Sequence, residues 1–350
     1  MISVHKYDIP GRRFFRVVFS RCHNTKTRYT NAMDTHIQEG ILSTVAFFDA
    51  IDTALTDTEV YELEFDAPKK PTVSQYDDAL KYLLMSQALV QSGPFVVLPG
   101  REQLIDERIE RGLLSEEKFT RAVRVTRFLR FIPFIRMVGV CNTLSFEMSR
   151  ADGDIDIFIV AEKSRVHIVH MLTTVVLHIL GMRRHGFHIA NRLCLSFYVA
   201  TDGLDVHRFA LAPRDPYLAQ WIRHVIPIFS IHQTAEKYWQ ANSDWLRTYF
   251  SDAYPYTPTI RRQVPDFFIS IIIRRTAEVC LLPFAPLLER TRFVTQLRKL
   301  KRSASRRMRT QPHDVVVDER TLKFHEEDRR AFYRTKMEQK VADIFGATRI

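Results

Sequence analysis

The pattern of apolar and polar residues predicts a compact helical unit at about residues 39–99. Apolar residues recur at helical spacing over residues 41–51 and 73–90, and the segment from Thr56 to Glu59 offers a cap for a helix between them. A short apolar run at 95–98 then predicts a strand. Helix, turn, helix, helix, strand is the order of a winged helix, a fold that often binds DNA through its third helix.

The third helix of this unit lacks the charge that DNA binding requires. It carries Asp77 and Asp78 against a single lysine, Lys81, so it has no basic face for phosphates. The sequence therefore favours a role in packing against protein over a role in DNA binding.

Beyond the helical unit, strands and helices alternate and predict a mixed α/β core. Cations at three-residue spacing mark the first helix, and Thr201-Asp202-Gly203 predicts a hairpin turn into the last strand. Strands are predicted at 134–140, 155–160, 193–199 and 204–209, and helices at 116–131 and 165–180.

After Pro216 the pattern turns helical. Helices are predicted at 217–229, 233–250, 267–288 and 326–345, and the short apolar run Val315-Val316-Val317 precedes the last of them. The chain then divides into an N-terminal extension (1–38), a winged-helix-like domain (39–112), the mixed core (113–215), a helical domain (216–300), and a basic linker with a C-terminal helix (301–350).

Composition supports a globular protein of several domains. The 350 residues are 46% hydrophobic and 26% charged, which is enough apolar material for sizeable cores. The four cysteines have no CxxC spacing, so neither a disulfide framework nor a zinc site is indicated. The start lacks a signal segment, and the apolar stretches at 166–180 and 267–288 are too short or too interrupted to span a membrane. We expect a cytoplasmic protein without a transmembrane span.

The net charge of +11 is concentrated in one block, residues 290–309, which contains no acid. Such a block can bind a nucleic-acid backbone or an anionic membrane surface, or it can be a solvated linker. Its nine cations are Arg290, Arg292, Arg298, Lys299, Lys301, Arg302, Arg306, Arg307 and Arg309.

The candidate chemistry lies at the start of the second strand of the core. Asp154 and Asp156 are two residues apart in Gly153-Asp154-Ile155-Asp156, so in a strand both carboxylates project from the same face. Two anions held this close call for a cation, and Mg²⁺ is the natural candidate because it bridges carboxylates to substrate phosphates. The pattern indicates nucleotide chemistry; the alternative is a solvated strand entry.

The order and spacing of these segments resemble the nucleotidyltransferase superfamily, which includes DNA polymerase beta and the antibiotic nucleotidyltransferases. The similarity is greatest to a group of uncharacterised bacterial proteins that join a winged-helix-like region to such a domain. In that superfamily a strand leads to a small glycine-containing turn and then to an Asp-x-Asp strand. Here the strand ending at Val140 leads to Cys141-Asn142-Thr143 and on to Asp154 and Asp156.

The resemblance implies an α+β fold with a nucleotidyltransferase mixed-sheet core over 113–215. It also implies a site in which Asn142 and Thr143 cradle the phosphates of a nucleoside triphosphate (NTP). Asn142 stands where the family has glycine, but asparagine tolerates left-handed backbone better than most residues. Capping of the next helix by Asn142 is the alternative.

The family's third carboxylate sits on a later strand, and the strand at 193–199 contains no acid. The candidates are Asp205, which we favour, and Asp202 in the preceding turn. Arg165 and Arg192 are further candidates for contacts with the triphosphate, as are Arg183 and Arg184.

We therefore hypothesise a Mg²⁺- or Mn²⁺-dependent nucleotidyltransferase. It would transfer a nucleoside monophosphate to an unknown acceptor hydroxyl and release pyrophosphate, with Asp154, Asp156 and Asp205 as metal ligands and catalytic acids. The alternative hypothesis is a catalytically inactive nucleotide-binding or adaptor protein that binds a protein, nucleic acid or anionic membrane.

Overall fold

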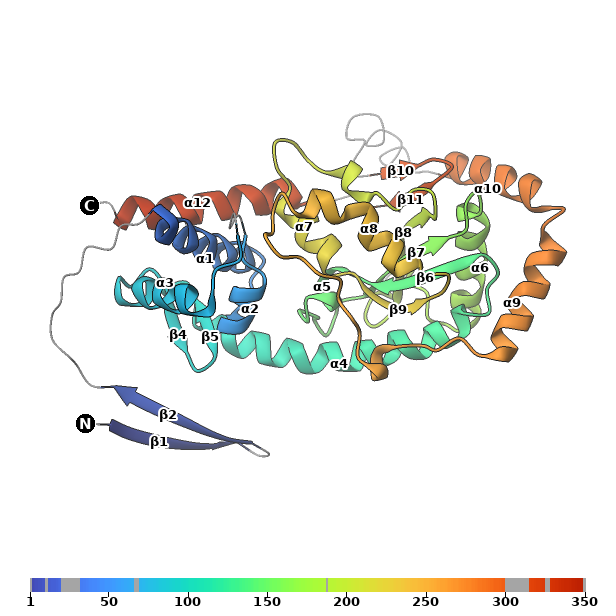
Figure 1. Ribbon diagram of the computed structural model, residues 1–350. Coiled ribbons are helices and arrows are strands. Elements are labelled where there is room, and N and C mark those ends of the chain that lie inside the picture. Colours follow the sequence, from blue (N-terminus) through green and yellow to red (C-terminus); the bar gives the residue numbers. More distant parts are fainter. Residues whose placement is uncertain are drawn as a thin grey trace.

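The computed structural model describes residues 2–9, 12–19, 32–65, 69–186, 188–299, 315–324 and 328–348. Within them the chain is a mixed α/β protein of the α+β type, as the sequence predicts. The helical unit lies at one end of the molecule and a six-stranded sheet at the other (Figure 1). The predicted N-terminal extension contains an antiparallel pair, β1 (Ile2–Ile9) and β2 (Arg12–Phe19).

The helical unit contains the predicted helices, and its caps explain where they begin. Thr56 and Thr72 each accept a hydrogen bond from the third residue of the helix that follows, Glu59 or Gln75, whose side chain bonds back. The predicted strand at 95–98 is confirmed as β5. The elements are α1 (Ala32–Ala50), β3 (Leu55–Thr56), α2 (Asp57–Glu62), α3 (Val73–Met85), β4 (Val90–Ser92) and β5 (Phe95–Val97), with strand order β3-β5-β4.

One long helix, α4 (Gln103–Leu129), joins the helical unit to the sheet and runs along both (Figure 1). It contains most of the predicted helix at 116–131 but begins earlier, so the predicted boundary at 112/113 falls inside a continuous helix. Its apolar side, which includes Phe119, Ala122 and Leu129, is buried against the sheet.

The six strands of the main sheet follow the order β10-β11-β8-β7-β6-β9. Only β7 and β8 are parallel, and α6 (Val166–Ile179) makes the crossover between them. Alternate residues of β7 enter two cores: Ile157 and Ile159 face α4 and α6, whereas Phe158 and Val160 face the helical unit and α7. The strands are β6 (Ile135–Val140), β7 (Ile155–Ala161), β8 (Leu193–Ala200), β9 (Ile226–Ser230), β10 (Val315–Val317) and β11 (Thr321–Phe324).

Two sequence predictions at the edges of this sheet are wrong. Residues 204–209 form no strand but a short 3-10 helix, η1 (Val206–Phe209), because the edge of β8 pairs with β11 from the C-terminal segment. The predicted helix at 217–229 ends at Arg223 in α7 (Pro216–Arg223), and the apolar run after it becomes β9 beside β6. The sheet thus draws strands from three of the predicted segments.

The C-terminal half contains α8 (Thr234–Leu246), η2 (Ile260–Arg262), α9 (Phe268–Leu281), α10 (Ala285–Lys299) and α12 (Arg330–Thr348). The final helix, α12, returns to the helical unit and packs against α1 and α7. The first part of the basic block lies on α10, and residues 300–314, which carry the rest, lie outside the described residues. Across the described ranges, no helix combines the length and apolar character needed to cross a bilayer.

Candidate functional site

Asp154 and Asp156 lie at the amino end of β7, on the side of the sheet that faces α7. Their side chains share this face with Phe158 and Val160, as the two-residue period of a strand requires. The loop before them is fastened from α4, where the buried Lys118 ammonium donates to the carbonyls of Arg150 and Gly153 at 2.5 and 2.6 Å. The carboxylates are thus positioned from both the strand and the loop.

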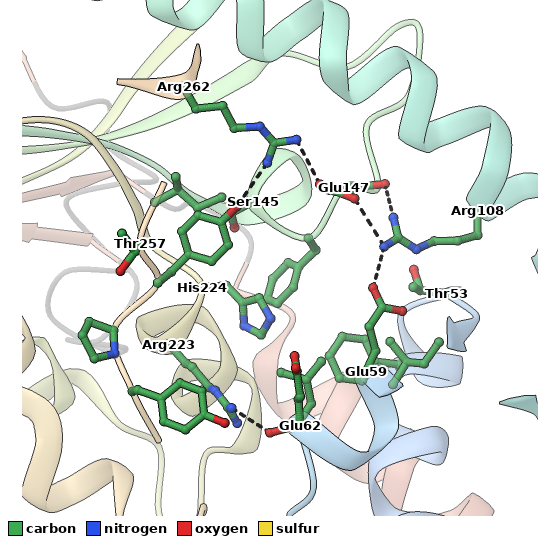
Figure 2. Close-up of a pocket in the computed structure, with 18 residues that line it drawn as sticks. Thr53, Glu59, Glu62, Arg108, Ser145, Glu147, Arg223, His224, Thr257 and Arg262 are labelled. Carbon is green, nitrogen blue, oxygen red and sulfur yellow. Dashed lines mark hydrogen bonds and ion pairs between the residues drawn. The ribbon is translucent and has the colours of Figure 1, made fainter. Parts of the chain in front are cut away.

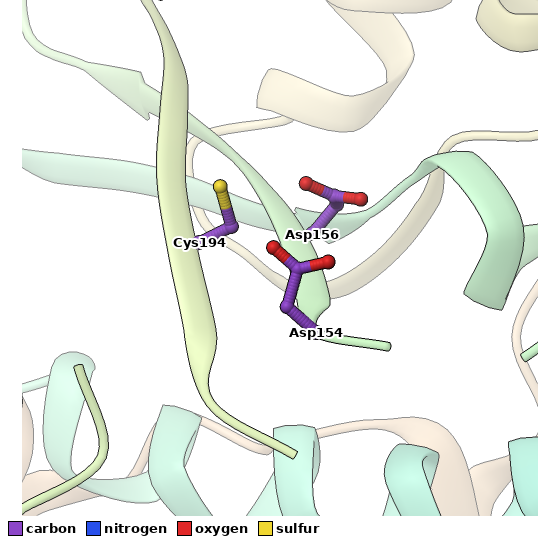
Figure 3. A group of neighbouring side chains, drawn as sticks. All are labelled: Asp154, Asp156 and Cys194. Atoms are coloured by element: carbon purple, nitrogen blue, oxygen red, sulfur yellow. The ribbon is translucent and has the colours of Figure 1, made fainter. Parts of the chain in front are cut away.

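The neighbouring strand adds a thiol to this pair. Asp156 is aligned with Cys194 of β8, and one oxygen of each aspartate and the Cys194 sulfur all lie within 4.8 Å of one another (Figure 3). Among the described residues, this is the one group of three such side chains close enough to share a metal ion. A cation already contacts it: Arg184 Nη1 lies 2.6 Å from Asp154 Oδ2.

Burial controls the protonation of the group. It raises the pKa of Asp156 to about 6, with a further increase from the charge of Asp154, while hydrogen bonds from Asn142 and Cys194 act in the opposite direction. Burial also raises the pKa of the Cys194 thiol to about 12, reinforced by the same two carboxylates. Without a bound cation, the sulfur is therefore a protonated hydrogen-bond donor at neutral pH.

Asn142 has the left-handed backbone that the sequence allows for. Its φ is +55°, and it follows directly from the end of β6, beside the amino end of β7. Its Oδ1 accepts a hydrogen bond of 2.7 Å from the Trp221 indole, and its side chain also bonds Asp156. The alternative role as a helix cap is wrong, because the capping position of α5 (Asn142–Ser145) is Cys141 and no side chain caps it.

A cavity of about 240 Å³ opens beside this turn. Asn142, Thr143 and Asp156 line it together with Trp221 of α7. Three cations that sequence reasoning did not connect to the site, Lys323, Arg329 and Arg330, also line it from the C-terminal segment. They are accompanied by Asp328, which pairs with Lys323 at 3.7 Å and with Arg330 at 2.7 Å. The cavity therefore joins a tight turn, two carboxylates and three cations from segments far apart in the sequence.

The structure does not bring Asp205 to the metal pair, which corrects the prediction of a third acid there. Because β7 and β8 are parallel, Asp205 lies beyond the carboxyl end of β8, and that end is about 20 Å along the strand from Cys194. It pairs instead with Arg208, and Asp202 lies at the same far end near Lys163.

The two arginines that the sequence predicts as phosphate contacts, Arg165 and Arg192, lie at opposite ends of the sheet. Arg165 follows the carboxyl end of β7, where its guanidinium stacks on Phe134 and donates to the carbonyl of Ser164, so the prediction that it contacts the triphosphate is wrong. Arg192 lies at the correct end, where its carbonyl accepts a hydrogen bond of 2.8 Å from Ile155 N.

A second cavity, of about 360 Å³, lies between the helical unit and the sheet and contains none of the predicted site residues (Figure 2). Its charged groups neutralise one another: Glu147 contacts Arg262 at 3.1 Å and Arg108 at 3.5 Å, and Arg108 also reaches Glu59 at 3.0 Å. These ion pairs bridge the two parts of the molecule.

The donor set at β7 suits a hard divalent cation only in part. Asp154 and Asp156 provide the carboxylate oxygens that Mg²⁺ and Mn²⁺ prefer, whereas sulfur, a softer ligand, occupies the third position. Comparison of the chain with protein-family models, curated protein sequences and solved structures finds no match. The function proposed below therefore depends on the residues of the site itself.

Proposed function

We propose that this chain is a Mg²⁺- or Mn²⁺-dependent nucleotidyltransferase. The observation that carries the proposal is the meeting of Asp154 and Asp156 with the Asn142 turn at one end of the sheet, beside a cavity that also contains cations. Paired carboxylates with a tight turn and basic side chains are the parts that phosphoryl-type transfer requires, because it depends on positioning and on neutralising phosphate charge.

In the proposed reaction, an acceptor hydroxyl oxygen attacks the α-phosphorus of an NTP, and the bond from that phosphorus to the bridging oxygen breaks to release pyrophosphate. Asp154 and Asp156 would hold the metal, which when bound supplies positive charge to the phosphates and to the attacking oxygen. Lys323 and Arg329 would bind phosphate oxygens, and the exposed Thr143 hydroxyl would donate to one. Asn142, fixed by Trp221, orients Asp156.

The proposal extends to the finer architecture. The order β6, turn, β7, α6, β8 agrees with a nucleotidyltransferase-type core, and the order α1, β3, α2, α3, β4, β5 agrees with a winged-helix-like unit. In this unit α3 still presents Asp77 and Asp78 as exposed residues, which favours a protein-packing role.

Binding of ATP, GTP, CTP and UTP, measured separately by calorimetry with and without Mg²⁺, tests the proposal. We expect Mg²⁺-dependent binding of at least one of them, and a loss of more than about tenfold in Asp156→Asn because a metal ligand is removed. Asp205→Asn is the matched control, since it neutralises an aspartate at the far end of the sheet and should bind as the wild type does. Equal Mg²⁺-dependent NTP binding by the wild type and Asp156→Asn would contradict the proposed role of Asp156 as a metal ligand.

Cys194→Asp sharpens the same experiment. It supplies the third carboxylate at the position where the structure has a thiol, so Mg²⁺ should bind roughly tenfold more tightly because affinity rises with the charge of the ligands. Unchanged Mg²⁺ affinity would mean that the group does not form a metal site.

A second candidate function is nucleotide binding without transfer. Two observations favour it: the thiol at the third position and the Arg184 guanidinium that already neutralises Asp154. Incubation with NTPs labelled at the α-phosphate, Mg²⁺ and cell extract separates the candidates. Transfer of label to an acceptor supports the nucleotidyltransferase, whereas Mg²⁺-dependent binding without any labelled acceptor supports the second candidate.

A further inference from the structure

The helix α9 has charged side chains on its buried side and apolar side chains on its exposed side. Two of its charged side chains point inward. Arg274, only 4% exposed, pairs with Asp266 at 2.6 Å and donates to the carbonyl of Arg130. One turn later, Glu278 accepts hydrogen bonds of 2.8 Å from Phe134 N and from Arg136. Ionic contacts, rather than an apolar stripe, therefore fasten this helix to the sheet.

The outer side of α9 is correspondingly apolar. Phe268 is 74% exposed, and an equally apolar surface continues from it over the start of α10. We call this surface the α9 apolar face; it consists of Phe268, Ile269, Ile272, Ile273, Val279, Leu282, Phe284 and Leu287. Single exposed apolar residues are ordinary, but a contiguous series along two helices marks an interaction site. Both helices lie at the end of the molecule away from α1 and α3 (Figure 1).

The exposed charges that α9 and α10 themselves carry have one sign. Within residues 267–299 the only acids are Glu278 and Glu289, and both are used inward: Glu289 accepts hydrogen bonds of 2.9 Å from the backbone N–H groups of His167 and Ile168. Arg275, Arg290 and Arg298 are exposed on the same two helices. The surface therefore combines apolar side chains with cations and has no outward carboxylate among the described residues.

From this combination we infer that the α9 apolar face docks on an anionic lipid surface. Apolar side chains enter the boundary between headgroups and acyl chains while arginines contact anionic headgroups, which is how interfacial helices bind. A second copy of this chain fits less well, because pairing the face with itself would bring the arginines of both copies together. A nucleic acid would make no use of the apolar residues. The inference is independent of the nucleotide site.

Vesicle flotation of the full-length chain tests the inference. We expect the protein to float with vesicles of phosphatidylcholine plus phosphatidylglycerol but not with phosphatidylcholine alone, and to dissociate as salt is raised. The variant Ile272→Ser with Ile273→Ser should lose most of this binding. Replacing Arg275, Arg290 and Arg298 by glutamine should weaken it roughly a hundredfold, since each cation contributes about 1 kcal/mol near such a surface.

The matched control is Val73→Ser with Met85→Ser, which removes two exposed apolar side chains from α3 and should bind vesicles as the wild type does. Circular dichroism and thermal unfolding of every variant confirm that it is folded. Three results would overturn the inference: no binding to anionic vesicles at low salt, equal binding by folded variants of the α9 apolar face, or a concentration-dependent dimer that those variants abolish in the absence of vesicle binding.

Discussion

Two aspartates, each paired with an arginine, show how differently one ion pair can be used. Asp215 lies at the start of α7 and is almost fully buried; its oxygens accept from Leu211 N and Leu218 N, each at 2.9 Å, and from Arg330 at 2.5 Å. Asp154 is partly exposed and contacts the more exposed Arg184. The first carboxylate accepts three hydrogen bonds from its own chain, and the second has a single protein hydrogen bond among the described residues.

The difference teaches where to look for function. A buried acid whose two oxygens both accept hydrogen bonds from its own chain is not available to a ligand, so Asp215 serves to hold α12 against α7. An acid with one partly exposed partner can exchange that partner for a metal or another cation. By this criterion Asp154 belongs to a site, and Asp215 belongs to the framework beside it.

Removing the buried Asp215 carboxylate should have the largest effect on stability. Asp215→Ala leaves two backbone N–H groups without their acceptor and takes from Arg330 one of its two buried carboxylate partners, so we expect a loss of about 3–4 kcal/mol in the free energy of unfolding. Denaturant unfolding measures it. Asp154→Asn is the comparison and should change stability by less than about 1 kcal/mol; equal losses would remove the distinction between the two aspartates.

Glu64 provides an intermediate case, because it is as buried as Asp215 but has no hydrogen-bond partner for either oxygen among the described residues. Burial raises the pKa of this carboxyl from 4.5 to about 7, and the charge of Lys70 limits the increase. The folded protein therefore holds a proton that the unfolded chain releases between these values, so stability falls as pH rises from about 4.5 to 7.

Glu64→Gln should abolish this dependence. Relative to the variant, the wild type should lose about 3 kcal/mol of unfolding free energy across that range, which unfolding curves at several pH values measure. Replacing the exposed Glu236 by glutamine should leave the slope unchanged. A parallel pH profile for wild type and Glu64→Gln would show that Glu64 stays ionised when buried.

Much of the fold follows from local patterns in the sequence. The capping residues Thr56 and Thr72 and the apolar runs of β6, β7 and β8 predict elements that the structure contains, because these signals act within a few residues. The predictions of Asp205 and Arg165 as site residues were wrong because they depend on how distant strands pair. Both follow the carboxyl ends of strands, and only the parallel pairing of β7 with β8 shows that these ends lie opposite the site.

The third residue of the group could not be read from alternation along the chain. The pairing of β7 with β8 shifts by one residue between Asp156 and Phe158, so β8 contains an extra residue there. Counting back by twos from Phe197 would place Cys194 on the opposite face of the sheet. Lys323 and Arg329 could not be predicted as site residues for a similar reason. The strand β11 joins the sheet from more than a hundred residues further along the sequence.

The smallest stability effect tests whether Arg184 holds the place of a metal. Arg184→Gln removes a guanidinium that is 45% exposed, so the free energy of unfolding should change by less than about 1 kcal/mol. Divalent-cation binding, followed with Mn²⁺ by electron paramagnetic resonance, should instead strengthen a few-fold because a competing charge leaves Asp154. Arg247→Gln is the matched control, since Arg247 pairs with Asp244 at the same 2.6 Å on the exposed side of α8. If Arg184→Gln destabilised the protein strongly and left Mn²⁺ affinity unchanged, Asp154 would belong with Asp215 to the framework and the contrast between them would fail.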